Sequence, residues 1–167
     1  MATVRLALEP EAALYPASAF AQFKSVSGTN FPVTSLAFDT STSETVYFRF
    51  PAFDYGSGNW TVTIHWYADT ASSGGVVWGV SLAAITPNTD SQDIETKAFD
   101  TEETVADTHL GTTGHRLHSV SLTLTETDAV AAGDDVTLRL ARKTADGSDD
   151  MAGDAQVVRV IVEYSNA

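Results

Sequence analysis

The 167-residue sequence predicts an all-β domain, and three observations carry this prediction. Apolar and polar residues alternate with a period of two in several short runs, which is the pattern of half-buried antiparallel strands. Clusters of glycine, proline, serine and aspartate separate these runs and mark turns. No long run has the periodicity of an amphipathic helix. About eight strands with some long connections favour a jelly-roll β-sandwich, with an immunoglobulin-like sandwich as the alternative.

The clearest alternation lies between Asn59 and Ile85. One face of the first run carries Trp60, Val62, Ile64 and Trp66. After Gly74 and Gly75 the alternation resumes around Trp78. We expect two strands joined as a hairpin, and we expect this hairpin to anchor the core because it contains all three tryptophans of the protein.

Two shorter strands are expected before this region, at residues 33–38 and 45–50, with the turn DTSTSE between them and Pro51 as the stop. After it, residues 86–114 are polar, acidic and irregular, with one short strand expected near residues 104–110. Alternation then returns at residues 118–124, 136–141 and 157–164. The last of these strands is apolar on both faces, so it is either central in a sheet or paired across a subunit contact.

Residues 1–31 differ from the regular part, residues 32–167. The sequence ATVRLAL predicts a short strand, and Pro10, Pro16 and Pro32 punctuate an aromatic stretch after it. Two interpretations remain open. The segment either covers the edge of the sandwich, which prevents unwanted edge pairing, or forms an extended arm that contacts a neighbouring subunit or another protein.

The net charge is −13 and the isoelectric point is near 4.4. An acidic surface disfavours binding to nucleic acid and to anionic membranes, since both depend on basic residues. No apolar run approaches the length of about 20 residues that spans a bilayer, and the N-terminus lacks the pattern of a signal peptide. The absence of cysteine excludes disulfides, thiol nucleophiles and thiolate metal ligands.

Metal binding and catalysis are each weighed and disfavoured. His109, His115 and His118 are candidate zinc ligands, and the acidic loop between Asp146 and Asp154 is a candidate calcium loop. The histidines are better explained as ordinary surface or loop residues, and the acidic loop as a solvated loop. We therefore expect no metal and no cofactor. The sequence lacks a G-x-S-x-G elbow, a cysteine nucleophile and a phosphate-binding loop, so we expect no enzyme activity.

Three tyrosines are candidates for stacking on sugars, because they are predicted on outward strand faces or in a loop: Tyr47, Tyr55 and Tyr67. Partly buried rings at strand edges or at a subunit contact are the simpler explanation for all three.

Six segments in order resemble a jelly-roll domain of tailed-phage virion proteins, most of all head decoration and head-fibre proteins. These segments are LAFD at 36–39, YFRFP at 47–51, WTVTIHW at 60–66, GVVW at 75–78, AGDDVTLRLAR at 132–142 and VIVEY at 160–164. They span most of residues 33–164, and the N-terminal 31 residues fall outside the resemblance.

The resemblance implies a homotrimeric capsid decoration protein that binds the major capsid protein on the outer surface of the virion and is made in the host cytoplasm. The apolar residues of the N-terminal arm are then the candidate capsid or subunit contacts: Val4, Leu6, Tyr15, Phe20 and Phe23. The alternative is a head-fibre, tail-fibre or carbohydrate-binding module that contacts host glycans.

Overall fold

The computed structural model describes residues 2–167 and consists of strands with one short 3-10 helix, η1 (Pro10–Ala12). The strands are β1 (Thr3–Leu8), β2 (Gln22–Val26), β3 (Val33–Phe38), β4 (Thr45–Pro51), β5 (Tyr55–Ala68), β6 (Gly75–Ile85), β7 (Glu103–Thr108), β8 (His118–Leu124), β9 (Asp135–Arg142) and β10 (Ala155–Asn166). Within these residues no helix is long and apolar enough to cross a bilayer.

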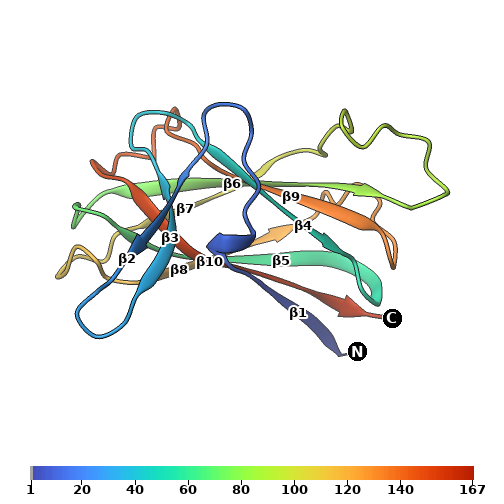
Figure 1. Ribbon diagram of the computed structural model, residues 1–167, viewed down its shortest axis with the longest axis horizontal. Helices are drawn as coiled ribbons and strands as arrows, with labels where there is room; N and C mark the ends of the chain where they lie inside the picture. The colour runs from blue at the N-terminus through green and yellow to red at the C-terminus, as the bar shows by residue number, and fades with distance from the viewer. Residues whose placement is uncertain (1) are drawn as a thin grey trace.

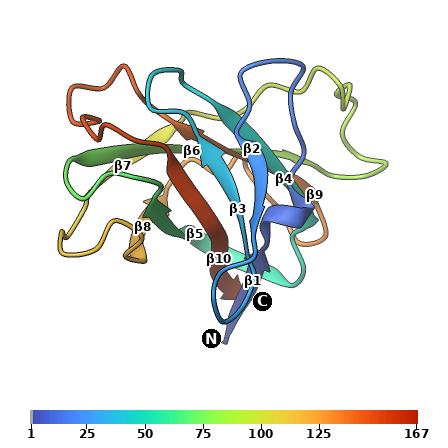
Figure 2. The ribbon, with the colours of Figure 1, turned by 60° about the vertical axis from the view of Figure 1, so that its left-hand side comes forward.

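Two antiparallel sheets face each other as the layers of a sandwich (Figure 1). The larger sheet has the order β2-β3-β10-β5-β8, with β1 also paired to β10, and the smaller sheet has the order β4-β9-β6-β7. The two chain ends lie side by side because β1 and β10 are antiparallel neighbours, as Figures 1 and 2 both show. The predicted jelly-roll β-sandwich is confirmed, with ten strands rather than about eight.

The predicted tryptophan hairpin is wrong. β5 pairs with β10 and β8 in the larger sheet, whereas β6 pairs with β9 and β7 in the smaller one. The loop after β5 therefore crosses from one layer to the other. Trp66 of β5 and Trp78 of β6 still meet, but across the sandwich, with ring centroids 6.4 Å apart. Both side chains are fully buried, so their place in the core is as expected.

β10 is central in the larger sheet, which explains why it is apolar on both faces. Its pairing with β5 shifts register between Val157 and Arg159, where a β-bulge interrupts the ladder. A bulge adds one residue to one strand and so changes which side chains face inward. Val157 consequently lies in the core and Val158 on the outer face, and Val160 then faces the core again, so the strict alternation expected for residues 157–164 is interrupted here.

The N-terminal segment contributes to both layers. β1 and β2 extend the larger sheet, and the chain between them runs beside the β4 edge of the smaller sheet. Leu14 and Tyr47 exchange two backbone hydrogen bonds of 2.7 and 2.9 Å there, and the Thr45 amide donates to the Ala19 carbonyl. The division of the chain at residue 31 stays a prediction.

The guanidinium of Arg142 lies fully buried at the end of β9 and organises the acidic loop that follows. All five of its N–H groups have acceptors. The Asp149 carboxylate accepts hydrogen bonds from Nε and Nη2 of Arg142. The remaining N–H groups donate to the carbonyl oxygens of Phe38, Met151 and Gly153. The guanidinium of Arg142 therefore fills the centre of the loop between Asp146 and Asp154, the candidate calcium loop of the sequence analysis.

Candidate functional site

A groove of about 540 Å³ lies on the outer face of the larger sheet, and we call it the outer-face groove. Its walls are the β2–β3 loop and the loop that precedes β8, which protrude on the same side of the sheet (Figure 1). The groove is lined by Val26, Gly28, Phe31, Val33, Tyr67, Asp69, His115, Leu117 and Val158. Most of these side chains are apolar, and a few polar groups lie among them.

The β2–β3 loop presents an exposed aromatic ring on one wall. Phe31 is 69% exposed, and it lies in the short connection between two paired strands. Gly28 makes the turn possible, because its φ is +62° and a β-carbon there would lie 2.2 Å from the Phe31 carbonyl oxygen. The position of Phe31 thus depends on the absence of a side chain at residue 28.

Replacing Gly28 with alanine is expected to cost about 1–2 kcal/mol in free energy of unfolding, because a side chain is strained at this φ and meets backbone. Thermal denaturation measures this loss. The matched control is Gly147→Ala in another exposed loop, where φ is ordinary and nothing lies within 4 Å of the added carbon. A Gly28→Ala protein as stable as the control would contradict the assigned loop conformation.

The floor of the groove comes from side chains that alternate away from the core. Tyr67 points outward because its neighbour Trp66 points inward on the same strand. The bulge in β10 adds Val158 beside it, and Val33 at the start of β3 completes the floor. Tyr67 is half-buried, so one part of its ring supports the sheet and another part faces the groove.

The second wall is the loop of residues 109–117. His115 Nε2 lies 2.6 Å from the Asp69 carbonyl oxygen, and its ring packs edge-on against Tyr67 with centroids 5.7 Å apart. A carbonyl oxygen only accepts, so Nε2 carries the proton and Nδ1 of the neutral ring remains an acceptor. Leu117, 61% exposed, adds an apolar surface to the same wall.

A charged cluster lies beside the groove, which Asp69 lines and Lys24 and Asp154 do not. Lys24 Nζ lies 3.9 Å from a carboxylate oxygen of Asp69 and 3.8 Å from one of Asp154. Lys24 lies on β2, Asp154 directly precedes β10 and Asp69 directly follows β5, so these contacts join three strands at one end of the larger sheet. All three side chains keep part of their surface in solvent, so their polar atoms are accessible to a ligand.

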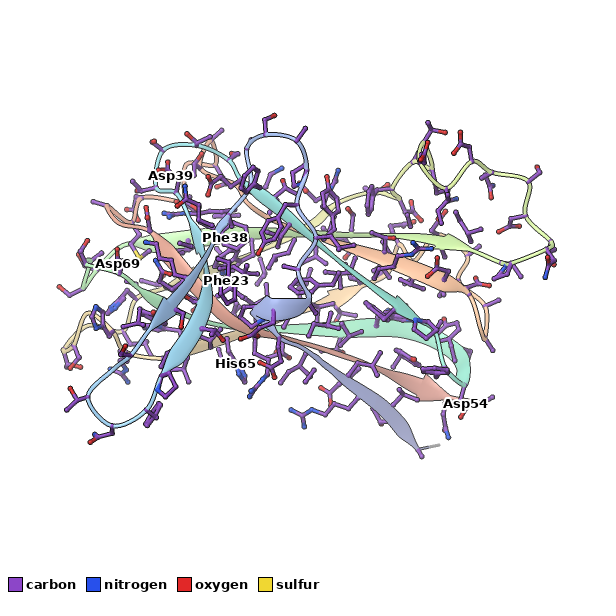
Figure 3. All side chains as sticks on the ribbon, in the orientation of Figure 1. Phe23, Phe38, Asp39, Asp54, His65 and Asp69 are labelled. Carbon is purple, nitrogen blue, oxygen red and sulfur yellow. The ribbon has the colours of Figure 1, made fainter. Side chains whose placement is uncertain are left out.

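Paired charges continue along the same face beyond the groove. Arg159 Nε lies 2.6 Å from Glu9, and Arg5 Nε lies 3.6 Å from Glu163. Burial, and then the charges of Arg159 and Arg5, lower the pKa of His65, which keeps this outward-facing imidazole neutral near pH 7. Figure 3 shows His65 on the outer side of the sheet and Phe38 between the layers.

His115 is exposed in a loop, as predicted, and His109 also lies in a loop, whereas His118 is a strand residue at the start of β8. His109 and His118 are buried, and their rings lie 4.5 Å apart. His115 instead contacts Asp69. Within residues 2–167 no three histidine, aspartate or glutamate side chains gather closely enough to hold a metal ion.

The outer face of the smaller sheet is largely covered by its own chain. A pocket of about 260 Å³ remains there, between β4 and the segment that follows β6. The Phe99 ring lies 5.7 Å from that of Tyr47, and the Arg139 guanidinium lies 4.9 Å above Phe99. Of the three predicted outward tyrosines, Tyr55 instead packs on Trp60 and Tyr164, so Tyr67 is the one that lines the larger groove.

None of the candidate contact residues in the N-terminal segment lines the outer-face groove. Val4 and Leu6 pack against the core from β1. Tyr15 and Phe20 form an edge-to-face pair 5.6 Å apart and remain 43% and 37% exposed, and Phe23 on β2 is 45% exposed. Their role in binding a capsid or a subunit stays a prediction.

Phe31, Asp69, His115 and Leu117 were not predicted to form a site. The sequence contains one signal for Phe31, a phenylalanine in a short loop between Gly28 and Pro32, where an aromatic ring has little room to be buried. His115 and Leu117 share one irregular loop, and Asp69 is distant from them in sequence, so no local pattern links the two parts of the site.

No protein-family model matches the chain, and no curated protein matches it. Solved structures do share its fold. The carbohydrate-binding module CBM6cm-2 of Cellvibrio mixtus lichenase 5A, solved with cellotriose, aligns with a TM-score of 0.52 and 10% identity over 96% of this chain and 98% of that one.

Two other modules are similar to the same degree. The xylan-binding module CBM15 aligns with a TM-score of 0.52 and 11% identity over 99% of both chains. TmCBM27, a carbohydrate-binding module described for mannan recognition, aligns with a TM-score of 0.51 and 8% identity over 99% of this chain and 100% of that one. The chain therefore has the jelly-roll fold of carbohydrate-binding modules. At such low sequence identity the similarity shows the fold alone.

Proposed function

We propose that this protein is a non-catalytic carbohydrate-binding module and that the outer-face groove is its binding site. The observation that carries the proposal is the composition of that groove. Two aromatic rings, Tyr67 and Phe31, and several aliphatic side chains line it, and the polar groups of Asp69 and His115 lie among them. Binding sites for small ligands typically combine apolar walls with a few placed polar groups.

Sugar rings match this chemistry. A pyranose has C–H groups that pack on an aromatic or aliphatic surface, and hydroxyl groups around its edge that need hydrogen-bond partners. In the groove the rings of Phe31 and Tyr67 offer the surface. Asp69 offers carboxylate oxygens, and His115 Nδ1 offers an acceptor for a hydroxyl.

The same groove is poorly suited to glycoside hydrolysis. That reaction requires two carboxyl groups on opposite sides of the scissile bond. Of the described residues that line the groove, Asp69 is the one with a carboxyl group. This composition supports binding without catalysis. The three modules with a similar fold are described with cellotriose, xylan and mannan, so these are the first ligands to test.

The capsid decoration role, the homotrimer and the virion location stay predictions that rest on the sequence resemblance. Glycan binding was the alternative function, and it is compatible with a fibre module of a virion. Sedimentation of the purified protein tests the trimer separately from glycan binding. A sedimentation coefficient of a monomer at all concentrations would count against the trimer.

Phe31→Ala is expected to weaken binding to the glycan that the wild type retains by about tenfold, which corresponds to about 1.4 kcal/mol. The loss is expected because the variant removes an exposed ring that packs on the sugar and changes nothing in the core. Isothermal titration calorimetry or affinity electrophoresis with cellotriose, xylan and mannan measures it.

The matched control is Phe53→Ala, since Phe53 is also exposed, at 61%. Figure 3 places its neighbour Asp54 at the end of the molecule opposite to Asp69. This control should bind as the wild type does. Equal losses in both variants, or no binding of any of the three glycans by the wild type, would contradict the proposed site.

A further inference from the structure

Two buried histidines hold the wall of the outer-face groove. The amide of Gly111 donates to His109 Nδ1, and the amide of Leu110 donates to His118 Nε2, each at 3.0 Å. Both donors belong to the 109–117 loop, which also carries His115 and Leu117. In the folded loop, each imidazole therefore accepts one hydrogen bond from a loop amide through an unprotonated ring nitrogen.

These contacts define the protonation state of both rings. His109 accepts at Nδ1, so its Nε2 carries the proton and donates to the Gly114 carbonyl oxygen at 3.0 Å. His118 accepts at Nε2, so its proton is on Nδ1, which is buried and has no hydrogen-bond partner among residues 2–167. Each ring is neutral, and a protonated ring would have no lone pair left for the loop amide.

The surroundings of the pair disfavour its charged forms. The His118 ring stacks on Trp66 with centroids 4.5 Å apart, and the His109 ring lies at the same distance on another side. Burial first, and then His109, lower the pKa of His118 from the usual 6.5. Asp107, which accepts from the Trp66 indole N–H, raises this pKa, and Arg116 acts both ways, because its charge lowers the pKa and its backbone raises it.

We propose that this histidine pair is an acid-sensitive latch on the groove, so that protonation detaches the 109–117 wall and releases the bound glycan. Detachment of the loop does not depend on a ligand, whereas release of the glycan rests on the proposed glycan-binding function. In acid, a new N–H on either ring meets the N–H of Gly111 or Leu110, and the two donors repel. The 109–117 loop then moves away from the sheet, and His115 and Leu117 no longer line the groove.

The sign of the stability effect follows from the lowered pKa of His118. The unfolded chain takes up a proton near pH 6.5, and the folded chain does so only at lower pH. The contribution of His118 to stability is therefore fully present above about pH 6.5 and is lost as the pH falls below that value.

The test of the latch is amide hydrogen exchange of the full 167-residue chain, followed by nuclear magnetic resonance without glycan. Between about pH 7.5 and about pH 5, protection factors of the Leu110 and Gly111 amides are expected to fall at least about tenfold, while those of the β10 amides change little. Unchanged protection at Leu110 and Gly111 would overturn the proposal.

The double variant His109→Asn, His118→Gln should remove this pH response. An asparagine oxygen replaces Nδ1 and a glutamine oxygen replaces Nε2 as acceptors, and neither amide takes up a proton in this range. The single variant His118→Gln serves if the double variant does not fold, and should halve or abolish the response. His65→Gln, on the same sheet but outside the loop, is the control that keeps it. A double variant with the wild-type response would contradict the assignment.

Binding is then measured at both pH values with whichever of cellotriose, xylan and mannan the wild type retains at about pH 7.5. Affinity of the wild type should fall about tenfold in acid, and that of the double variant should not. His115→Gln should keep the fall, which separates the buried pair from the histidine inside the groove. A fall that disappears in His115→Gln would overturn the latch, whereas failure of all glycans to bind would overturn the proposed function and leave the exchange result intact.

Discussion

Arg142→Met is expected to destabilise the protein by about 3–5 kcal/mol, the usual cost of removing one partner from a buried ion pair. The variant leaves the buried Asp149 carboxylate without its cation, and it removes the guanidinium N–H groups that donate to the carbonyl oxygens of Phe38, Met151 and Gly153. The melting temperature should fall by roughly 6–20 °C for a chain of this size. Thermal and urea denaturation measure both values.

Arg49→Met is the matched control, because Arg49 also pairs with an aspartate, Asp135, but remains partly exposed. Exposed pairs contribute about 0–1 kcal/mol. If both variants lose the same stability, the buried network is not what holds the loop together. Because a guanidinium fills the centre of this loop, treatment of the wild type with a calcium chelator should leave its melting temperature unchanged.

Trp66→Ala is expected to cost about 3–5 kcal/mol in free energy of unfolding. The fully buried indole packs against Trp78 across the sandwich and against His118 on the neighbouring strand. Its removal leaves a large cavity between the sheets, and it removes the surface on which the histidine pair rests. Urea denaturation measures the loss, and a variant as stable as the wild type would show that the core assignment is wrong.

Conservative substitutions distinguish the three buried tryptophans further. The Trp66 indole N–H donates to Asp107 at 2.9 Å, whereas those of Trp60 and Trp78 have no partner among the described residues. Replacing Trp66 with phenylalanine leaves an acceptor of Asp107 unpaired, and the same change at Trp78 removes a buried N–H that had no acceptor. Trp66→Phe should therefore destabilise the protein more than Trp78→Phe, by about 1 kcal/mol.

Most of the individual strands could be predicted from the sequence, because period-two alternation is a local signal. Residues 33–38 form β3 with the predicted bounds, and β8 also begins and ends as expected. The pairing of strands could not be predicted in the same way. Consecutive β5 and β6 look like a hairpin in sequence, but whether two amphipathic strands pair edge to edge or face each other depends on the rest of the fold.

The candidate site was harder to predict than the fold. Tyr67 was identified as an outward aromatic, but its companions Phe31 and His115 come from loops that are distant in sequence. The bulge after Val157, which turns Val158 toward the groove, has no clear signal in a pair of adjacent valines. The buried positions of His109 and His118 depend on a loop that closes over them, which local alternation does not describe.

The sequence by itself determined the fold class, most strand positions, the buried tryptophans and the acidic surface, because each depends on residue chemistry and on spacing along the chain. The tertiary structure alone decided which strands share a sheet, where the bulge turns β10, and which loops meet over the larger sheet. These outcomes depend on contacts between residues far apart in sequence. The outer-face groove exists only where such contacts bring Phe31, Tyr67 and His115 together.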